Sequence, residues 1–329
     1  MRREGVLIEQ PNHQVVDIAS WKGDDQFEIY PEGARDKSLL ISPTGTDYSF
    51  LIENHRYLFK HSFQTKKRSI PDQYWTEIIA YRIGCMLGIP VPPAFVAYNS
   101  EQNICGSLIE WFLNYPDQAN ELSVSGGDIM SALIPSYDRK KGKEHNFLSI
   151  ELFLTVINKN VEFETNWLES WCGMLLFDSI IGNTDRHQDN WELLWNQVRA
   201  RRVRLSPVFD NGTSLGYEIL ESKMSDFYSK NKMAAYINKG RHHLKWHQND
   251  DKSCQHIRLL TLLTNKHPDL IYCINNTLDL FSQEQLHSIL NNCTQYSISV
   301  PLSSKRADFI CHLVTQRVRA IKQKFERYQ

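Results

Sequence analysis

Three polar side chains near the middle of the chain have the types and the spacing that phosphoryl transfer requires. Asp185 is followed five residues later by Asn190, and Asp210 precedes a glycine twenty residues further on. Phosphoryl transfer uses one carboxylate to accept the proton of the acceptor hydroxyl. It uses an amide oxygen and a second carboxylate to hold Mg²⁺ against the phosphates. Asp185 is therefore the candidate catalytic base, and Asn190 and Asp210 are the candidate Mg²⁺ ligands.

The sequence around these residues favours this interpretation over an ordinary polar turn, in which Asn, Asp and His are also common. The apolar run 171–181 predicts a helix that ends at the motif. The runs 191–195 and 203–209 predict a β-hairpin that leads to Asp210. A helix, a polar loop, a hairpin and an Asp in this order are what the catalytic lobe of a kinase requires.

The first 110 or so residues predict a sheet interrupted by one helix. Apolar residues recur at helical spacing from Asp72, the expected N-cap, to Leu87, and Gly88 ends the helix. Short apolar runs between Pro, Gly, Asn and Asp predict strands at 6–8, 15–18, 38–41, 50–52, 57–59 and 94–98.

Lys60 and Glu77 lie where a two-lobed kinase needs an ion pair. Lys60 ends the strand 57–59, and Glu77 lies within the predicted helix. An ion pair between them would fix the ammonium group that contacts the α- and β-phosphates of ATP. The segment 106–112 predicts a strand that runs into a hinge, where backbone groups and apolar side chains such as Phe112 could contact adenine. An ordinary strand end would have the same residues.

We therefore predict an α+β, two-lobed, protein-kinase-like fold. The β-rich N-lobe would span residues 1–112, and the mostly helical C-lobe residues 113–329. Ser282 and Gln285 form a capping box for one C-lobe helix. The apolar stripe from Phe309 to Phe325 predicts a long C-terminal helix.

Composition argues against several other classes of protein. The chain has 37 basic and 38 acidic residues, so no bulk charge attracts nucleic acid or an anionic membrane. No apolar run approaches the roughly 20 residues that span a bilayer, and the N-terminus lacks the apolar core of a secretory signal. The seven cysteines include no Cys-x-x-Cys pair, which is typical of reduced thiols. We expect a cytoplasmic protein with no direct binding of nucleic acid or membrane.

A histidine-rich stretch from His242 to His256, with His243, His247 and Cys254, raises the question of a zinc site. Its spacing fits no closed zinc-site pattern well. A polar helix and loop at the surface is the favoured interpretation.

A longer set of motifs resembles the HipA-like toxin kinases. The segment 31–40 reads Pro-Glu-Gly-Ala-Arg-Asp-Lys-Ser-Leu-Leu and is similar to that family's Gly-Ala phosphate loop. The resemblance continues in the family's order from Glu77 to Pro92, at Ile109-Glu110, through 182–190 and at 207–210. The length is similar to that of the compact CtkA-type members, which are bacterial Ser/Thr kinases.

The resemblance implies an ATP- and Mg²⁺-dependent Ser/Thr protein kinase that can phosphorylate itself. Gly33 and Ala34 would let the backbone approach the phosphates, and Lys37 would add a phosphate contact. Glu110 would mark the adenine hinge. His187 would either bond the catalytic loop or donate to the γ-phosphate.

The same resemblance implies a toxin or an effector delivered to a host cell. Its substrate would be a protein, either a translation factor or a host protein, and an antitoxin is a candidate partner. Family members often carry an autophosphorylated Ser before the Gly-Ala loop, whereas this chain has Tyr30 there and no Ser or Thr in 28–32. Tyr30 is either a phosphorylation site that opens the loop or a strand residue that packs its ring under it.

Two other functions compete with this interpretation. Asp185-Arg186-His187-x-x-Asn190 is also the catalytic string of phosphoinositide 3/4-kinases, although no membrane-binding helix or long basic segment accompanies it here. A catalytically weak interaction module would have no need to keep Lys60, Asp185, Asn190 and Asp210 together.

Overall fold

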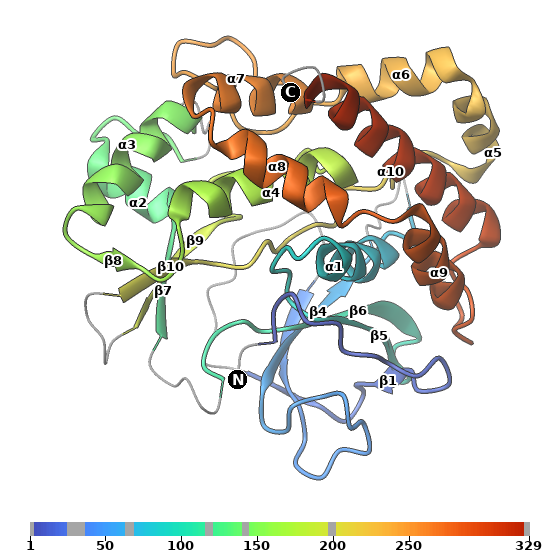
Figure 1. Cartoon of the computed structure of the whole chain (residues 1–329). Helices are drawn as coiled ribbons and strands as arrows, with labels where there is room; N and C mark the ends of the chain where they lie inside the picture. The colour runs from blue at the N-terminus through green and yellow to red at the C-terminus, as the bar shows by residue number, and fades with distance from the viewer. Residues whose placement is uncertain are drawn as a thin grey trace.

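A mixed sheet forms the N-terminal part of the molecule and lies below a group of helices in Figure 1. The computed structural model describes residues 3–24, 37–62, 69–115, 121–139, 145–196 and 202–325. Within these residues the sheet has the strands β1 (Val16–Asp17), β2 (Lys22–Gly23), β3 (Lys37–Ile41), β4 (Arg56–His61), β5 (Ala94–Asn99) and β6 (Ile104–Glu110). Their spatial order is β1-β5-β6-β4-β3-β2. Only β1 and β5 pair in parallel among these described strands.

Two predicted strands are not strands. The segments 6–8 and 50–52 have no ladder partner among the described residues, because tyrosine hydroxyls bond their backbones instead. The Tyr81 hydroxyl accepts from the Ile8 N–H (2.7 Å) and donates to the Val6 carbonyl (2.7 Å). The Tyr57 hydroxyl accepts from the Ile52 N–H (2.8 Å). Phe50 and Leu51 of the second segment are buried against the sheet, whereas Val6 and Leu7 of the first are exposed.

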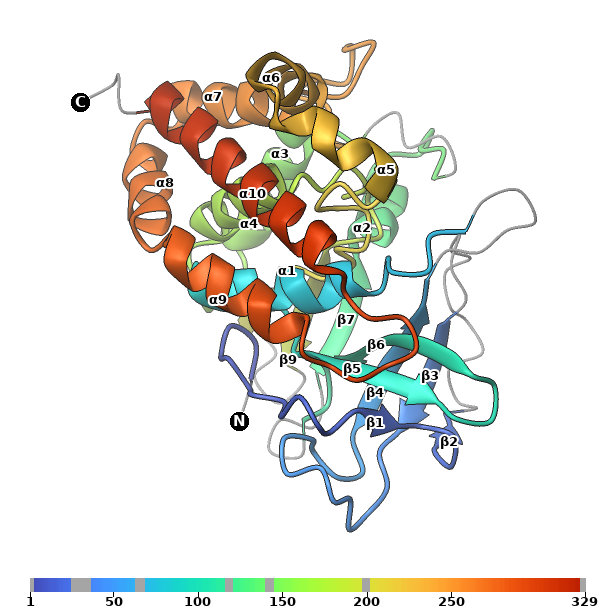
Figure 2. The same ribbon diagram turned by 90° about the vertical axis from the view of Figure 1, so that its right-hand side faces the viewer.

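The predicted helix of the N-terminal part is α1 (Trp75–Met86), and its start differs from the prediction. Asp72 is not the N-cap; Tyr74 is, without a side-chain cap bond. The Asp72 carboxylate instead accepts from Arg306 Nε (3.0 Å), so tertiary pairing uses the side chain that was expected to cap. Residues 75–84 are all buried, because α1 lies between the sheet and the C-terminal helices (Figures 1 and 2).

The C-terminal part holds most of the helices and a second sheet. That sheet has the order β7-β9-β10-β8, from β7 (Glu121–Ser125), β8 (Glu162–Phe163), β9 (Glu192–Asn196) and β10 (Arg202–Leu205). Its helices are α2 (Gly126–Leu133), α3 (Phe147–Asn158), α4 (Trp167–Ile181), α5 (Glu221–Met224), the 3₁₀ helix η1 (Ser225–Tyr228), α6 (Lys230–Lys239), α7 (His256–Lys266), α8 (Leu270–Asp279), α9 (Gln283–Cys293) and α10 (Ser304–Phe325).

Several C-terminal predictions are confirmed. The apolar run 171–181 lies in α4, and β9 and β10 form the predicted antiparallel hairpin, although β10 ends at Leu205 rather than near 209. Ser282 caps α9 by accepting from the Gln285 N–H (3.2 Å). The predicted stripe of α10 is buried.

The main hydrophobic core joins α1 to the helices of the C-terminal part. Side chains of α1 and α4 belong to one buried cluster, whereas a second cluster covers the other face of the six-stranded sheet. The helix that carries Glu77 is thus packed as part of the C-terminal core. The predicted α+β class is confirmed.

Among the described residues, no helix combines the length and the hydrophobicity needed to cross a bilayer. The seven cysteines are free thiols.

Candidate active site

Lys60 lies at the centre of the candidate site and is buried. Its Nζ donates to Glu77 Oε1 (2.9 Å) and to Asp210 Oδ1 (2.8 Å). The other oxygen of Glu77 accepts from the Asn211 N–H (2.9 Å). One ammonium group therefore joins the six-stranded sheet, α1 and the Asp210 loop, which are the three parts that the sequence analysis expected to meet.

Lys37 lies on the same face of the sheet as Lys60. The two residues are directly opposite each other in the β3–β4 pair, and directly paired residues of antiparallel strands share a face. This places a second ammonium group beside the first, on the side that faces α1. Gly33, Ala34 and Tyr30 lie outside the described residues.

The candidate catalytic loop, residues 183–190, begins where α4 ends at Gly182. This residue has φ +71°, and a Cβ there would come within 2.6 Å of the Arg317 guanidinium, so both conformation and space require glycine. Asn183 Oδ1 then accepts from the Asp185 N–H (3.2 Å). Asn190 Nδ2 donates to the Asp185 carbonyl (2.7 Å). Asp185 and Asn190 are thus held in one tight loop.

The imidazole of His187 is oriented by this loop. Its Nδ1 accepts from the Asp189 N–H (3.2 Å), so the neutral ring carries its proton on Nε2. Nδ1 thus bonds the loop, and Nε2–H is left to donate a hydrogen bond. One ring can therefore fill both roles that the resemblance offered, bonding the loop and donating to the γ-phosphate.

Arg186 ties the catalytic loop to the Asp210 loop, a role that sequence reasoning did not assign. Its fully buried guanidinium pairs with Asp178 (2.8 Å) and donates to Asn211 Oδ1 (2.8 Å) and to the Asn190 carbonyl (3.1 Å). It also donates to the carbonyl of Phe209. The Asp-Arg-His motif contains Arg186, but its partners could be found only from the fold.

The hydrogen bonds and the charge of this network lower the pKa of Asp178. Burial opposes ionisation of its carboxyl, but the charge of Arg186 and a hydrogen bond from His242 Nε2 (2.9 Å) outweigh that effect. The pKa of Asp178 is therefore well below its usual range. Asp210, which follows Phe209, has φ +54°, a conformation that Asp tolerates better than most residues.

Glu110 does not point toward Lys60. It pairs directly with Tyr57 of β4, which is three positions from Lys60, so its side chain lies on the face of the sheet opposite to that of Lys60. There it accepts from Tyr115 (3.0 Å) and Tyr57 (3.3 Å) and lies 3.5 Å from Arg3. Burial raises the pKa of Glu110 to about 7, against a usual value of 4.5. Only its backbone could contact a nucleotide at the Lys60 face.

Phe112 is buried where the chain leaves the sheet. Its ring centroid lies 5.2 Å from that of Phe209 and 5.6 Å from that of Trp111. With Leu113 and Leu194 these side chains form a small apolar cluster beside Asp210. The predicted hinge therefore packs directly on Phe209, the residue before the candidate metal ligand Asp210.

The histidine-rich stretch lies partly in the core and partly beside the candidate catalytic loop. His242 bonds Asp178, and His256 is buried. Within the parts of the chain that are described, no three His, Cys, Asp or Glu side chains are grouped as a metal site would need. His243 instead lies beside the catalytic loop, with its ring centroid 6.0 Å from that of His187. Burial lowers the pKa of His243, although the charge of Asp185 raises it.

The donor set fits a Mg²⁺ ion that is shared with phosphates. Because Asn190 donates through Nδ2, its amide oxygen can accept a metal, and Asp210 supplies a carboxylate. Mg²⁺ commonly takes one or two protein oxygens and completes its shell with phosphates and water. These residues meet that requirement.

Comparisons with known proteins agree with this geometry. The family described as the HipA-like C-terminal domain matches residues 30–283. The chain belongs to this family. Among curated protein sequences, none matches significantly.

A solved kinase shares the fold. The proinflammatory kinase CtkA of Helicobacter pylori superposes with a TM-score of 0.71 at 18% identity, over 96% of this chain and 99% of that one. HipA from a Shewanella oneidensis MR-1 complex with HipB and operator DNA gives 0.49 at 15% identity, over 90% and 66% of the two chains. The predicted resemblance to HipA-like kinases and the two-lobed kinase-like fold are confirmed, and a fold of this kind generally uses ATP and a divalent metal.

Proposed function

We propose that this protein is a Mg²⁺- and ATP-dependent kinase that phosphorylates Ser or Thr side chains of proteins. The observation that carries the proposal is the double contact of Lys60 with Glu77 and Asp210. Structural ion pairs are common, but this one joins the three elements that ATP-dependent phosphoryl transfer needs in one place. Membership of the HipA-like family supports the same reaction class.

In this proposal each residue has one task. Lys60 binds the α- and β-phosphates, and its ion pair with Glu77 orients the ammonium group. Asn190 and Asp210 would hold Mg²⁺, which neutralises charge that develops on the phosphates. Asp185 accepts the proton of the acceptor hydroxyl. His187 Nε2–H donates toward the transferred group.

Labelled ATP with Mg²⁺ tests the proposal directly. The protein is incubated with a cell extract, and separately alone and with phosphatidylinositol vesicles, next to an Asp210→Asn control. Phosphoserine or phosphothreonine that forms only with the parent supports the proposal. Label in the lipid fraction alone would indicate a lipid kinase, and no label in any fraction would indicate a binding module.

Mass spectrometry of the protein incubated alone tests autophosphorylation. Phosphate on Tyr30 in the parent, absent from the Asp210→Asn protein, would support control of the phosphate loop at that position. Phosphate confined to other side chains would remove Tyr30 as the switch.

A toxin or effector role, the protein substrate and an antitoxin partner stay predictions of the resemblance. A phosphoproteomic comparison of cells that express the two proteins tests the substrate prediction.

A further inference from the structure

The candidate catalytic loop is held at the surface of the molecule as well as in the core. The Gly127 N–H, at the start of α2, donates to the Gln188 carbonyl (2.9 Å), and Gln188 Nε2 donates to the Arg139 carbonyl (2.9 Å). Arg186 holds the same loop from the buried side. The start of α2 and the segment at Arg139 thus fix residues 188–189 from the outside.

The side chain of Arg139 lies between two carboxylates, one of which belongs to the loop. Its Nη2 and Nε donate to Asp189 Oδ1 (2.6 and 3.1 Å), and its Nη1 donates to Asp128 Oδ1 (2.7 Å). Nη2 also donates to Ser125 Oγ (3.2 Å). Ser125 is the N-cap of α2, and Asp128 lies in the first turn of that helix. One guanidinium therefore fastens the Asp189 carboxylate to the start of α2.

The backbone of α2 leaves room for this contact. A Cβ on Gly127 would lie 2.2 Å from Asp189 Oδ1 and 2.9 Å from Arg139 Nε, so a larger residue there would displace the pair. The Arg139 side chain is 44% exposed and that of Asp189 is 16% exposed. Ion pairs with an exposed member contribute little to the stability of a fold. The main effect of the contact should therefore be on the position of Asp189.

Asp189 connects Arg139 to the imidazole of His187. The Asp189 N–H donates to His187 Nδ1 (3.2 Å), and Asp189 Oδ2 lies 3.9 Å from the same nitrogen. Asp189 also directly precedes Asn190, a candidate Mg²⁺ ligand. A movement of Asp189 would therefore displace the ring that the loop orients.

We propose that Arg139 is a positioning residue for phosphoryl transfer and acts through Asp189 on His187. This inference rests on the proposed kinase function, in which His187 Nε2–H donates toward the transferred group. A reacting group that is displaced by about 1 Å can slow a reaction by up to about 100-fold. Loss of the Arg139 contact should slow the chemical step and leave the affinity for Mg·ATP nearly unchanged, because Lys60 and Asp210 keep their contacts.

The rate of label transfer from saturating Mg·ATP to the proteins of a cell extract tests the effect on chemistry. We expect Arg139→Gln to lower this rate about tenfold and the Kd for Mg·ATP to stay within about twofold. Arg139→Lys should restore part of the rate, because a Lys keeps the charge but lacks the planar fork of a guanidinium. An Arg139→Gln protein as fast as the parent would overturn the proposal.

Two further variants separate this role from a general loss of charge. Arg202→Gln is the matched control, because Arg202 is 43% exposed and pairs with Glu162, away from the loop; its rate should equal that of the parent. Asp189→Asn combined with Arg139→Gln should be no slower than the slower single variant, since both changes break one contact. Rate losses that multiply in the double variant would show that Arg139 does not act through Asp189.

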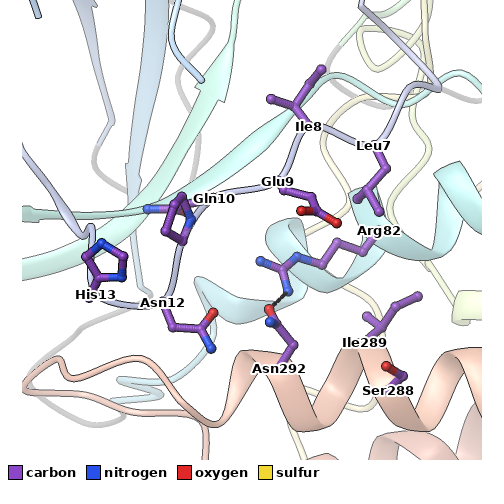
Figure 3. A pocket seen from close by; sticks show the side chains of 11 residues that line it. Leu7, Ile8, Glu9, Gln10, Asn12, His13, Arg82, Ser288, Ile289 and Asn292 are labelled. Atoms are coloured by element: carbon purple, nitrogen blue, oxygen red, sulfur yellow. Dashed lines mark hydrogen bonds between the residues drawn. The ribbon is translucent and has the colours of Figure 1, made fainter. Parts of the chain in front are cut away.

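The exposed position of Arg139 keeps this test apart from folding. Arg139→Gln should melt at the temperature of the parent, because an exposed pair contributes little to stability. Arg82 would be a poor choice for such a test. It holds α1 by donating to Asn292 Oδ1 (Figure 3) and is buried, so its replacement would change folding as well.

NMR of the histidine rings gives a readout that does not require catalysis. The ¹H–¹⁵N signals of the His187 ring are assigned by their loss in His187→Gln. Arg139→Gln should shift them, and Arg202→Gln should not. Phosphate transfer by the parent with unshifted signals in Arg139→Gln would overturn the positioning role alone. Shifted signals in a protein that transfers no phosphate would overturn the kinase function and leave the link from Arg139 to His187 in place.

Discussion

At the scale of single residues, Asp210 and Asp185 carry different parts of the proposed reaction. Asp210 would hold the metal, so Asp210→Asn should abolish most of the rise in melting temperature that Mg·ATP produces, because a carboxylate on the metal contributes several kcal/mol. Differential scanning fluorimetry with and without Mg·ATP measures this. An undiminished rise would mean that Asp210 is not a metal ligand.

Asp185 should affect the chemical step rather than nucleotide binding. It would contact the acceptor hydroxyl and not ATP, so Asp185→Ala should lower kcat by roughly 10²–10⁴. The Kd for Mg·ATP, measured by calorimetry, should stay within about twofold. If affinity falls in parallel with kcat, Asp185 belongs to the metal site.

At the scale of elements, Arg186 fixes the position of the loop that carries Asn190 relative to the loop that carries Asp210. Arg186→Met leaves Asp178 buried without its charged partner, and loss of one member of a buried pair costs about 3–5 kcal/mol. Urea unfolding measures the free energy of unfolding. Arg202→Met is the matched control, because the Arg202–Glu162 pair is 43% and 64% exposed and such pairs contribute at most about 1 kcal/mol. Equal losses in the two variants would contradict the role of Arg186.

The hinge should make stability depend on pH through Glu110. Its pKa is about 7 in the folded protein and 4.5 when unperturbed. Glu110 thus contributes fully to the free energy of unfolding below pH 4.5. This contribution, at most about 3 kcal/mol, is lost as the pH rises through 7. Burial lowers the pKa of His55, which stacks on Tyr115, to about 4. His55 therefore lowers the free energy of unfolding as the pH falls, opposite to the effect of Glu110. Glu110→Gln should therefore be more favourable relative to the parent at pH 8 than at pH 5 in urea unfolding.

Much of the site could be predicted from sequence because its residues lie in short motifs with fixed spacing. Lys60, Glu77 and Asp210 meet as expected. Lys60 and Glu77 lie within elements that the apolar pattern reveals, and Asp210 follows the hairpin of β9 and β10 by a few residues. The partners of Arg186 could not be predicted, because they come from α4 and from the loop after β10. Asp72 was misassigned for the same reason: Arg306, more than 200 residues away in the chain, takes the carboxylate.

At the scale of the whole molecule, α1 is held by the segment 292–300, which is far from it in the sequence. The Tyr74 hydroxyl donates to the Val300 carbonyl (2.6 Å), and so does the Trp75 indole (3.1 Å). Arg82 is held by Asn292 and Tyr296. Figure 2 shows the segment after α9 running past α1 toward β5 and β6, where the Ser299 hydroxyl bonds the Cys105 thiol (3.0 Å). Proper placement of Glu77 therefore depends on residues that follow it by more than 200 positions.

This arrangement has a consequence for the cell that makes the protein. Synthesis proceeds from the N-terminus at about 5–20 residues per second, and domains fold as their parts emerge. The Lys60 and Asp210 segments leave the ribosome well before the segment 292–300 that fixes α1. A nascent chain would thus lack a fixed position for α1 and Glu77 until the segment 292–300 has left the ribosome. A ribosome-bound chain stalled before residue 292 should fail to bind Mg·ATP, whereas the released full chain should bind it.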